Sequence, residues 1–261
     1  MREPPGGLPE VTISEHEGVR YLHLGTPWVQ GAMRIARPRA IELDYVQRML
    51  AALLWLSPDD LAEGRAVQLG LGAGALTRFT HAELGMDTTA IELNARVILA
   101  CRAKFRLPAD GAGLQVVCGD AAQWVERPPR GYAASVRLLH VDLYDHEAAA
   151  PVLDDEAFYA RCRALLEPGG VMAVNLFGRQ ASLAHSAARI QAAFGAGQVW
   201  SVRATREGNT VVVAGRDVAP PARGVLAARA ATIEARFGRL GLPARKWLRM
   251  VRPWSARPVT D

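Results

Sequence analysis

From residue 65 onward, apolar runs of strand length alternate with segments whose apolar positions recur at helical spacing. A strand followed by a helix, repeated several times, predicts a parallel sheet with helices on both of its faces. The expected strands are 66–71, 88–93, 114–118, 136–143 and 171–177, and the expected helices lie near 75–84, 94–105, 154–166 and 179–194.

Different patterns flank this region on both sides. Residues 11–35 form short alternating runs broken by glycine and proline, which indicates β-hairpins too small to hold a core alone. Between residues 41 and 56, apolar residues recur every three or four positions, which predicts one amphipathic helix. Segments 199–204 and 210–214 have a period of two and predict an antiparallel hairpin at the sheet edge, before a last helix over 225–241.

These elements together predict an α/β protein with a Rossmann-like fold, in an arrangement typical of nucleoside-binding transferases. Its parallel sheet would end in an antiparallel hairpin and would be preceded by a small N-terminal β-hairpin region. We expect a hairpin region over 1–37, a nucleoside-binding domain over 38–241 and a basic, Pro/Arg-rich tail over 242–261.

The composition indicates a globular protein. The chain has 261 residues, of which 50% are hydrophobic and 22% charged, and this excludes a disordered or collagen-like chain. No apolar run approaches the roughly 18 residues that a membrane-spanning helix needs. The first twenty residues carry several acids and prolines and no apolar segment typical of a secretory signal. We therefore expect a soluble, cytoplasmic protein that does not bind membranes.

The charge and the cysteines add little chemistry. The net charge is +5, but only Lys104 and Lys246 of the 31 basic residues are lysines. Such an excess of arginine over lysine is typical of a source genome with a biased base composition and does not by itself indicate phosphate binding. The basic C-terminal stretch also lacks a recognisable reading module, so we do not expect a nucleic-acid partner. Cys101, Cys118 and Cys162 are scattered without metal-binding spacing, so neither a metal site nor a disulfide is expected.

The strongest local signal is the sequence Gly70-Leu71-Gly72-Ala73-Gly74, between the first expected strand and its helix. Glycines at a helix start let a ligand lie against the main chain. Glu92 follows 22 residues after Gly70, at the end of the next strand, where a carboxylate can accept hydrogen bonds from a ribose diol. The G-x-G-x-x-G spacing of a dinucleotide site would need a glycine at residue 75, where this chain has Ala75, so a single nucleoside is favoured. The alternative is that Glu92 is an acid that lies in solvent at the end of the strand and binds no ligand.

Carboxylates also end the third and fourth expected strands. Asp120 can accept a hydrogen bond from the exocyclic amine of adenine, or cap the helix that begins at Ala121, or do both. Asp142 and Asp145 follow the fourth strand, and paired carboxylates in a cleft can hold a cation and take its proton. A turn-forming aspartate with a helix cap is the alternative for this pair.

With these sites placed, the chain resembles the spermidine/spermine synthase family, the polyamine aminopropyltransferases, over roughly residues 21–215. That family has a class I methyltransferase-like fold. The matching positions are the glycine loop for its GGGDG, Glu92 for the acid of V-E-I-D, Asp120-Ala121 for D-[GA], Asp142 to Asp145 for D-x-x-D, and Gln30 and Tyr45 for its glutamine and tyrosine before the glycine loop.

The resemblance implies transfer of an aminopropyl group from decarboxylated S-adenosylmethionine to a small amine, in a homodimer and with no metal. Asp142 would act as the base, and Asp145 and Tyr45 would orient the acceptor amine. The donor would be bound by Gln30, Gly70, Gly72, Gly74, Glu92 and Asp120.

Several positions differ from the family pattern. Ala73 replaces the acid that meets the donor's amine end, Asn94 replaces the second acid of E-I-D, and Val46-Gln47 replaces the H-E or Q-E pair. Residues 206–209 replace the family's tyrosine and paired glycines. One alternative is a methyltransferase that uses intact S-adenosylmethionine and meets its carboxylate with Arg34, Arg37 or Arg78. Another is a nucleoside-binding protein without catalysis.

Overall fold

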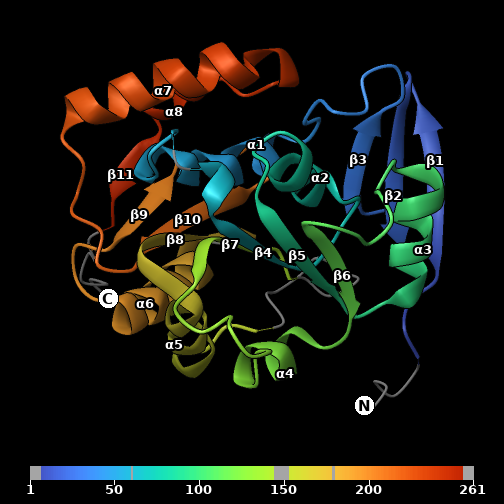
Figure 1. The fold of residues 1–261 in the computed structure, drawn as a ribbon. Coiled ribbons are helices and arrows are strands. Elements are labelled where there is room, and N and C mark those ends of the chain that lie inside the picture. The colour runs from blue at the N-terminus through green and yellow to red at the C-terminus, as the bar shows by residue number, and fades with distance from the viewer. Residues whose placement is uncertain (1–6, 60, 144–152, 178–179, 255–261) are drawn as a thin grey trace.

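The computed structural model of the protein describes residues 7–59, 61–143, 153–177 and 180–254. Its centre is an eight-stranded sheet in the order β11-β9-β10-β8-β7-β4-β5-β6 (Figure 1). The five strands from β8 to β6 run parallel, and β10, β9 and β11 are antiparallel additions. The strands are β4 (Arg65–Leu69), β5 (Asp87–Glu92), β6 (Leu114–Cys118), β7 (Val136–Val141), β8 (Leu166–Phe177), β9 (Val199–Val202), β10 (Asn209–Gly215) and β11 (Val251–Pro253).

Helices cover both faces of this sheet, as the alternating pattern predicts (Figure 1). Each face has its own apolar core, built from the side chains that alternate along the strands. One face carries α1 (Asp44–Met49), η1 (Leu50–Trp55), α2 (Ala75–Ala82), α7 (Arg223–Phe237) and α8 (Ala244–Trp247), and the other carries α4 (Ala121–Glu126), α5 (Glu156–Leu165) and α6 (Gln180–Phe194); η2 (Leu61–Glu63) and η3 (Gly238–Leu240) are short 3₁₀ turns.

A second, three-stranded antiparallel sheet lies at the N-terminus and consists of β1 (Val11–His16), β2 (Val19–Leu24) and β3 (Gly31–Arg34). It packs on α3 (Ala95–Lys104) through an apolar cluster that includes Leu22, Met33 and Val97. Its strand β3 also touches the glycine loop, since a Cβ at Gly31 would lie 2.4 Å from the backbone nitrogen of Ala73. The small sheet is therefore in direct contact with the loop that follows β4.

Two segments differ from the expected elements. The single helix expected over 41–56 is an α-helix only as far as Met49, and it continues as the 3₁₀ helix η1. All six residues of η1 are buried, and Trp55 packs against Trp200 of the sheet with ring centroids 4.9 Å apart. A pattern with one apolar face could not anticipate a segment that is enclosed on every side.

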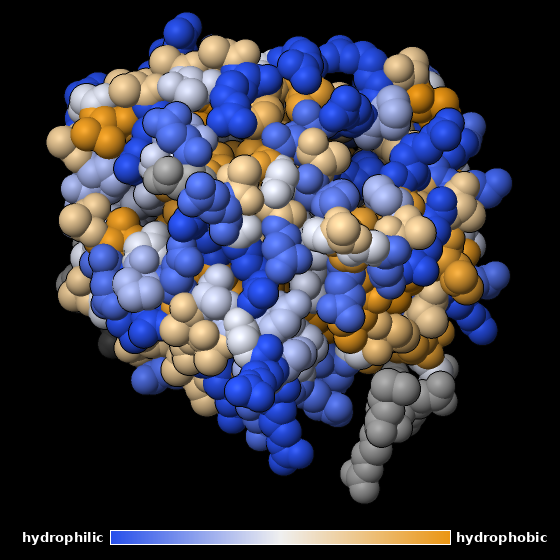
Figure 2. Space-filling model, viewed as in Figure 1, coloured by the Kyte–Doolittle hydropathy of each residue, from blue (hydrophilic) through white to orange (hydrophobic). Residues whose placement is uncertain are grey.

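The second difference concerns the end of the chain. Residues 242–254 contribute α8, with Trp247 only 1% exposed, and strand β11, which pairs with β9. Where the chain divides into domains stays a prediction. None of the helices in the described part of the chain has the length and apolar character needed to cross a membrane. Figure 2 shows a face covered mainly by polar side chains, with hydrophobic ones gathered near α3 and β6.

Candidate active site

The main cavity lies at the carboxyl edge of the parallel strands and has a volume of about 690 Å³. It opens where the sheet changes direction, because β4 is followed in space by β5 and β6 on one side and by β7 and β8 on the other. Ligands of open α/β sheets bind at such switch points. The N-terminal sheet and the loop before β3 form a second wall of the cavity, across from the carboxyl edge of the main sheet. They contribute Leu22, Trp28 and Val29 to the lining of the cavity.

The glycine loop forms the floor of this cavity. Gly70 has a φ of +86°, and a Cβ there would lie 2.1 Å from the carbonyl oxygen of Asp142, so only glycine fits between β4 and β7. Gly70 and Gly72 line the cavity, whereas Gly74 is the N-cap of α2 and is not among the lining residues. The loop thus brings main chain, without side chains, to the cavity wall.

Glu92 ends β5 with its carboxylate anchored by backbone amides. Oε2 accepts a hydrogen bond from the nitrogen of Leu71 at 3.0 Å, and Oε1 accepts one from the nitrogen of Asn94 at 2.8 Å. Burial raises the pKa of this carboxyl group, and the backbone donors oppose that rise. Each oxygen can still accept a further hydrogen bond, as binding a ribose diol requires.

Asp120 performs the capping role that the sequence suggests. Its Oδ1 accepts hydrogen bonds from the nitrogens of Ala122 at 2.7 Å and Gln123 at 3.4 Å, at the start of α4. The residue also lines the cavity beside Gly119 and Ala121. The capping oxygen fixes the side chain so that the carboxylate remains at the cavity wall, and a ligand role stays a prediction.

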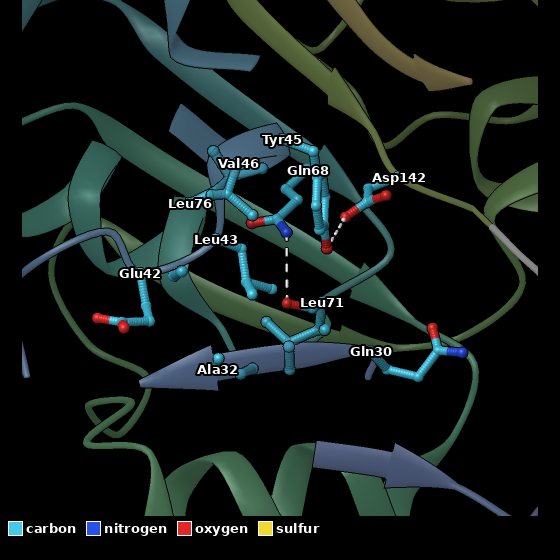
Figure 3. A pocket seen from close by; sticks show the side chains of 14 residues that line it. Gln30, Ala32, Glu42, Leu43, Tyr45, Val46, Gln68, Leu71, Leu76 and Asp142 are labelled. Atoms are coloured by element: carbon cyan, nitrogen blue, oxygen red, sulfur yellow. Dashed lines mark hydrogen bonds between the residues drawn. The ribbon is translucent and has the colours of Figure 1, made fainter. Parts of the chain in front are cut away.

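Asp142 follows β7 and is held by two side-chain donors. The hydroxyl of Tyr45 donates to Oδ2 at 3.2 Å (Figure 3). On the other side, Nδ2 of Asn175 donates to Oδ1 at 2.9 Å. Burial raises the pKa of Asp142, while these two hydrogen bonds lower it. The structure therefore brings Tyr45 and Asp142 together, as expected for residues that act on one amine. Asp145, the predicted partner of Asp142, lies outside the described residues.

Two asparagines of the site are missing from the sequence-based set. Asn209 at the start of β10 donates from Nδ2 to Oδ1 of Asn175 at 3.1 Å, so a chain of amides leads to Asp142. Both residues line the cavity, together with the exposed Glu207 of the preceding turn. The available signal is a single amide in the otherwise apolar run 171–177, near the carboxyl end of a buried strand.

Gln30 lies just before β3 and lines both the main cavity and a much smaller one of about 20 Å³ beside the glycine loop. Figure 3 shows the residues that line the smaller cavity. Its Nε2 is buried and has no hydrogen-bond partner among the described residues. A buried amide without a partner is costly, so a ligand that accepts a hydrogen bond there would be favoured. This observation is consistent with the predicted binding role of Gln30.

Among the described residues, the charged side chains that line the cavity all have one sign. The lining includes acids and, among the described residues, no arginine, lysine or histidine. The three arginines proposed as carboxylate binders are engaged elsewhere: Arg34 pairs with Glu42 at 2.5 Å, Arg37 donates to the carbonyl of Arg239, and Arg78 donates to the carbonyls of Ala73 and Phe105 at 2.7 Å. The acids that line the main cavity are Glu92, Asp120, Asp142 and Glu207.

Similar proteins are found by sequence. No protein-family model matches the chain. The polyamine aminopropyltransferase of Neisseria meningitidis serogroup A is 30% identical to it over 216 residues, which cover 82% of this chain and 79% of the relative. That of Chromobacterium violaceum is 32% identical over 240 residues, covering 91% of this chain and 88% of the relative. The chain belongs to the polyamine aminopropyltransferase family.

Solved structures confirm the fold of this aminopropyltransferase family member. A probable spermidine synthase from Corynebacterium glutamicum superposes with a TM-score of 0.72 at 17% identity, covering 99% of both chains. Human methyltransferase-like protein 13, solved in complex with SAH, gives 0.63 at 19% identity and covers 84% of this chain and 98% of that one. The methyltransferase-like fold expected from the sequence is therefore confirmed.

The family relationship makes the substitution at residue 73 informative. The Ala73 side chain is 3% exposed and lies against Gly31 of β3, where a Cβ would come within 2.5 Å of it. A carboxylate at this position would be buried at the contact between the small sheet and the glycine loop. In this aminopropyltransferase family member, the small, closely packed Ala73 therefore stands at the position where the family has an acid.

Proposed function

We propose that this protein transfers the aminopropyl group of decarboxylated S-adenosylmethionine to a small amine acceptor. The single-signed charge of the cavity carries the proposal. Decarboxylated S-adenosylmethionine has a sulfonium and an ammonium group and no carboxylate, and an amine acceptor is a cation at neutral pH. Both substrates therefore suit a cavity lined by Glu92, Asp120, Asp142 and Glu207 with no basic side chain among its described lining.

The nucleoside half of the donor would lie over the glycine loop. Glu92 would accept hydrogen bonds from the ribose hydroxyls, and Asp120 would accept one from the amine of adenine. Gly70 and Gly72 would let the nucleoside approach the backbone, and the exposed side chains of Trp28 and Val29 give the cavity an apolar wall. These roles follow from the order of the residues along the carboxyl edge of the sheet.

The chemical step needs a base. An alkylammonium has a pKa of about 10.4, so almost none of the acceptor has a free lone pair at neutral pH. Asp142 would take that proton, with Tyr45 holding its carboxylate in place. The lone pair of the freed nitrogen would attack the aminopropyl carbon that is bound to sulfur. The carbon–sulfur bond would break at the same time, and the electron pair of that bond would leave on the sulfur of methylthioadenosine. Holding both reactants in line supplies much of the rate.

A methyltransferase reaction with intact S-adenosylmethionine is disfavoured by the same charges. That donor carries a carboxylate, and Arg34, Arg37 and Arg78 each make other contacts. Burial also lowers the pKa of Arg78 to about 10. Its side chain is held below the glycine loop by backbone carbonyls, so it is not positioned to bind an anion in the cavity.

Product analysis tests the proposal directly. The protein is incubated with each donor and a panel of diamines and polyamines, and the products are measured by mass spectrometry. We expect methylthioadenosine and an amine enlarged by one aminopropyl group. Formation of adenosylhomocysteine would support a methyltransferase instead, and no product from either donor would indicate a nucleoside-binding protein.

The Glu92→Ala variant tests the nucleoside site. Loss of a charge-assisted hydrogen bond at a partly buried group costs about 1–3 kcal/mol, so methylthioadenosine should bind more weakly by that amount. Isothermal titration calorimetry measures the difference. An unchanged affinity would show that Glu92 does not bind the nucleoside.

The Asp142→Asn variant separates catalysis from binding. The amide keeps the shape of the side chain but cannot take the acceptor's proton at neutral pH. We expect turnover to be lost while methylthioadenosine still binds, as measured by the product assay and calorimetry. A variant that retains full turnover would exclude Asp142 as the base.

The homodimer, the cytoplasmic location and the role of Asp145 belong to the same proposal. They rest on the family relationship, and no metal takes part in the proposed reaction. Sedimentation velocity of the purified protein tests the homodimer, since the chain mass of 28.2 kDa separates monomer from dimer clearly.

A further inference from the structure

A short segment before the first strand takes part in the cavity wall. Leu8 and Pro9 line the cavity although they precede β1 and belong to neither sheet. Both side chains are partly buried. Pro9 lies close to the turn after β2, because a Cβ at Gly25 would be 3.7 Å from its own Cβ. The segment therefore runs between this turn and the nucleoside end of the sheet.

One side chain fastens this segment to the sheet. Nδ2 of Asn94 donates a hydrogen bond to the carbonyl oxygen of Pro9 at 3.0 Å. Oδ1 of the same amide accepts from the nitrogen of Arg96 at 3.0 Å and caps α3. The Asn94 backbone nitrogen donates to Glu92, and the residue is only 4% exposed. Asn94 thus links Glu92, the start of α3 and the N-terminal segment.

The chemistry of this contact explains why an asparagine stands where the family pattern has an acid. Aspartate and asparagine cap helices about equally well, because both present an oxygen to the backbone. Only the amide can also donate to the Pro9 carbonyl. An aspartate would instead direct a carboxylate oxygen at that carbonyl oxygen, which repels it.

We propose that Asn94 is a positioning residue that holds Leu8 and Pro9 against the nucleoside end of the cavity, making this segment part of the donor site. The inference rests on the proposed nucleoside site. The ligand it serves is an adenosine with a thioether or sulfonium at its 5′ carbon. Leu8, Pro9 and Leu93 would shield the bound nucleoside and the Glu92 carboxylate from water.

The Asn94→Asp variant of the full chain isolates the fastening contact, since it keeps the cap of α3. We expect its affinity for methylthioadenosine to fall by about five- to tenfold, the range expected for one lost hydrogen bond. Hydrogen exchange of a peptide covering residues 7–11 should become faster. Asp155→Asn is the matched control, because Asp155 caps α5 through the nitrogen of Phe158 and does not line the cavity. It should leave both measurements unchanged.

A second variant tests whether the effect passes through the segment. Leu8→Gly should weaken methylthioadenosine binding by itself, and adding Asn94→Asp to it should weaken binding by less than the product of the two single effects. Full multiplication of the effects would overturn the proposal, because Asn94 would then act independently of the segment.

The other combinations of affinity and exchange results also test the positioning role of Asn94. Faster exchange at residues 7–11 with unchanged affinity would show that the segment contributes nothing to the site. Weaker binding with unchanged exchange would assign Asn94 a direct contact with the ligand and overturn the positioning role. If the unaltered protein does not bind methylthioadenosine, the proposed function fails before this inference is reached.

Discussion

Opposing influences act on the carboxyl group of Asp142. Burial favours its protonated form, whereas the hydrogen bonds from Tyr45 and Asn175 favour the carboxylate. As the proposed base, Asp142 must be ionised at the working pH, and the two donors would limit the effect of burial on its pKa. Asn209 completes the arrangement, because its hydrogen bond to Asn175 fixes which end of that amide faces Asp142.

Removing one donor should move the pH dependence in a defined direction. A raised pKa means that activity falls, as the pH is lowered, at a higher pH than for an ordinary carboxylate. The Asn175→Leu variant loses a donor to the charged form, which raises the pKa of Asp142 further. We therefore expect the acid limb of the kcat/KM profile to shift to higher pH, while activity on the alkaline side is retained.

A suitable control is Gln198→Leu, which also removes a hydrogen-bonded amide, here just before β9. Gln198 bonds the backbone of Val218 and lies outside the cavity lining. Its profile should keep the original acid limb. If Asn175→Leu lowers activity equally at all pH values, the amide does not control the ionisation of Asp142.

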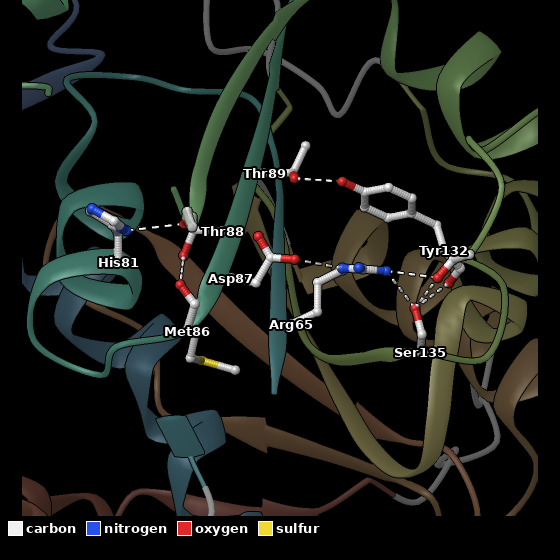
Figure 4. A network of polar contacts seen from close by, with 10 residues as sticks. Arg65, His81, Met86, Asp87, Thr88, Thr89, Tyr132 and Ser135 are labelled. Carbon is white, nitrogen blue, oxygen red and sulfur yellow. Dashed lines mark hydrogen bonds and ion pairs between the residues drawn. The ribbon is translucent and has the colours of Figure 1, made fainter. Parts of the chain in front are cut away.

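At the scale of the elements, the opposite edge of the sheet is held by Arg65 at the start of β4. Its guanidinium donates to Asp87 of β5 at 3.1 Å and to Ser135, just before β7, at 2.9 Å (Figure 4). It also lies over the ring of Tyr132, 4.3 Å from the centroid, and Tyr132 hydrogen-bonds Thr89 at 2.8 Å. One side chain therefore ties together the amino ends of three neighbouring strands.

Arg65→Met should lower stability without affecting the site. The variant loses several hydrogen bonds and a stacking contact at a partly exposed position, which we expect to cost about 1–2 kcal/mol in the free energy of unfolding. Chemical denaturation measures this loss, and calorimetry with methylthioadenosine should give an unchanged affinity.

The comparison variant is Arg102→Met. Arg102 pairs with Asp110 at 2.8 Å, with both side chains more exposed than Arg65. Such surface pairs contribute about 0–1 kcal/mol. Equal losses in the two variants would mean that the Arg65 network adds nothing beyond an ordinary ion pair.

How far the sequence predicts these elements depends on what determines each one. The five parallel strands and the hairpin of β9 and β10 were predictable, because their apolar runs reflect burial inside the sheet. Strand β11 was not, since Val251–Pro253 is short and forms only by pairing with β9. The site follows the same division: Glu92 and Asp120 stand in local motifs at strand ends, whereas the contact of Asn94 with Pro9 joins residues 85 apart.

For the whole molecule, overall charge and local charge have opposite signs. The chain carries a net charge of +5, yet the described lining of the cavity has acids and no basic side chain. At a distance, the net positive charge of the chain weakly repels a cationic substrate. Inside the cavity, the acids of the lining attract the same substrate. Salt screens both effects, so its influence on binding reports which one is larger.

We expect the local charge to dominate. Raising the ionic strength shortens the screening length from about 30 Å at 0.01 M to about 3 Å at 1 M. The KM values of the cationic donor and acceptor should therefore rise with KCl. Binding of the uncharged methylthioadenosine serves as the control and should hardly change. KM values that fall with salt would mean that repulsion by the net positive charge outweighs the acids of the cavity.

The acidic lining has a further consequence for how a catalytic cycle would end. The nucleoside would enter with two positive charges and leave with none, while the acceptor would keep its charges and gain one more ammonium, with one proton released. Glu92, Asp120, Asp142 and Glu207 would then attract the enlarged amine more strongly than the spent nucleoside. Methylthioadenosine would dissociate readily, and departure of the polyamine product would limit the rate of repeated turnover.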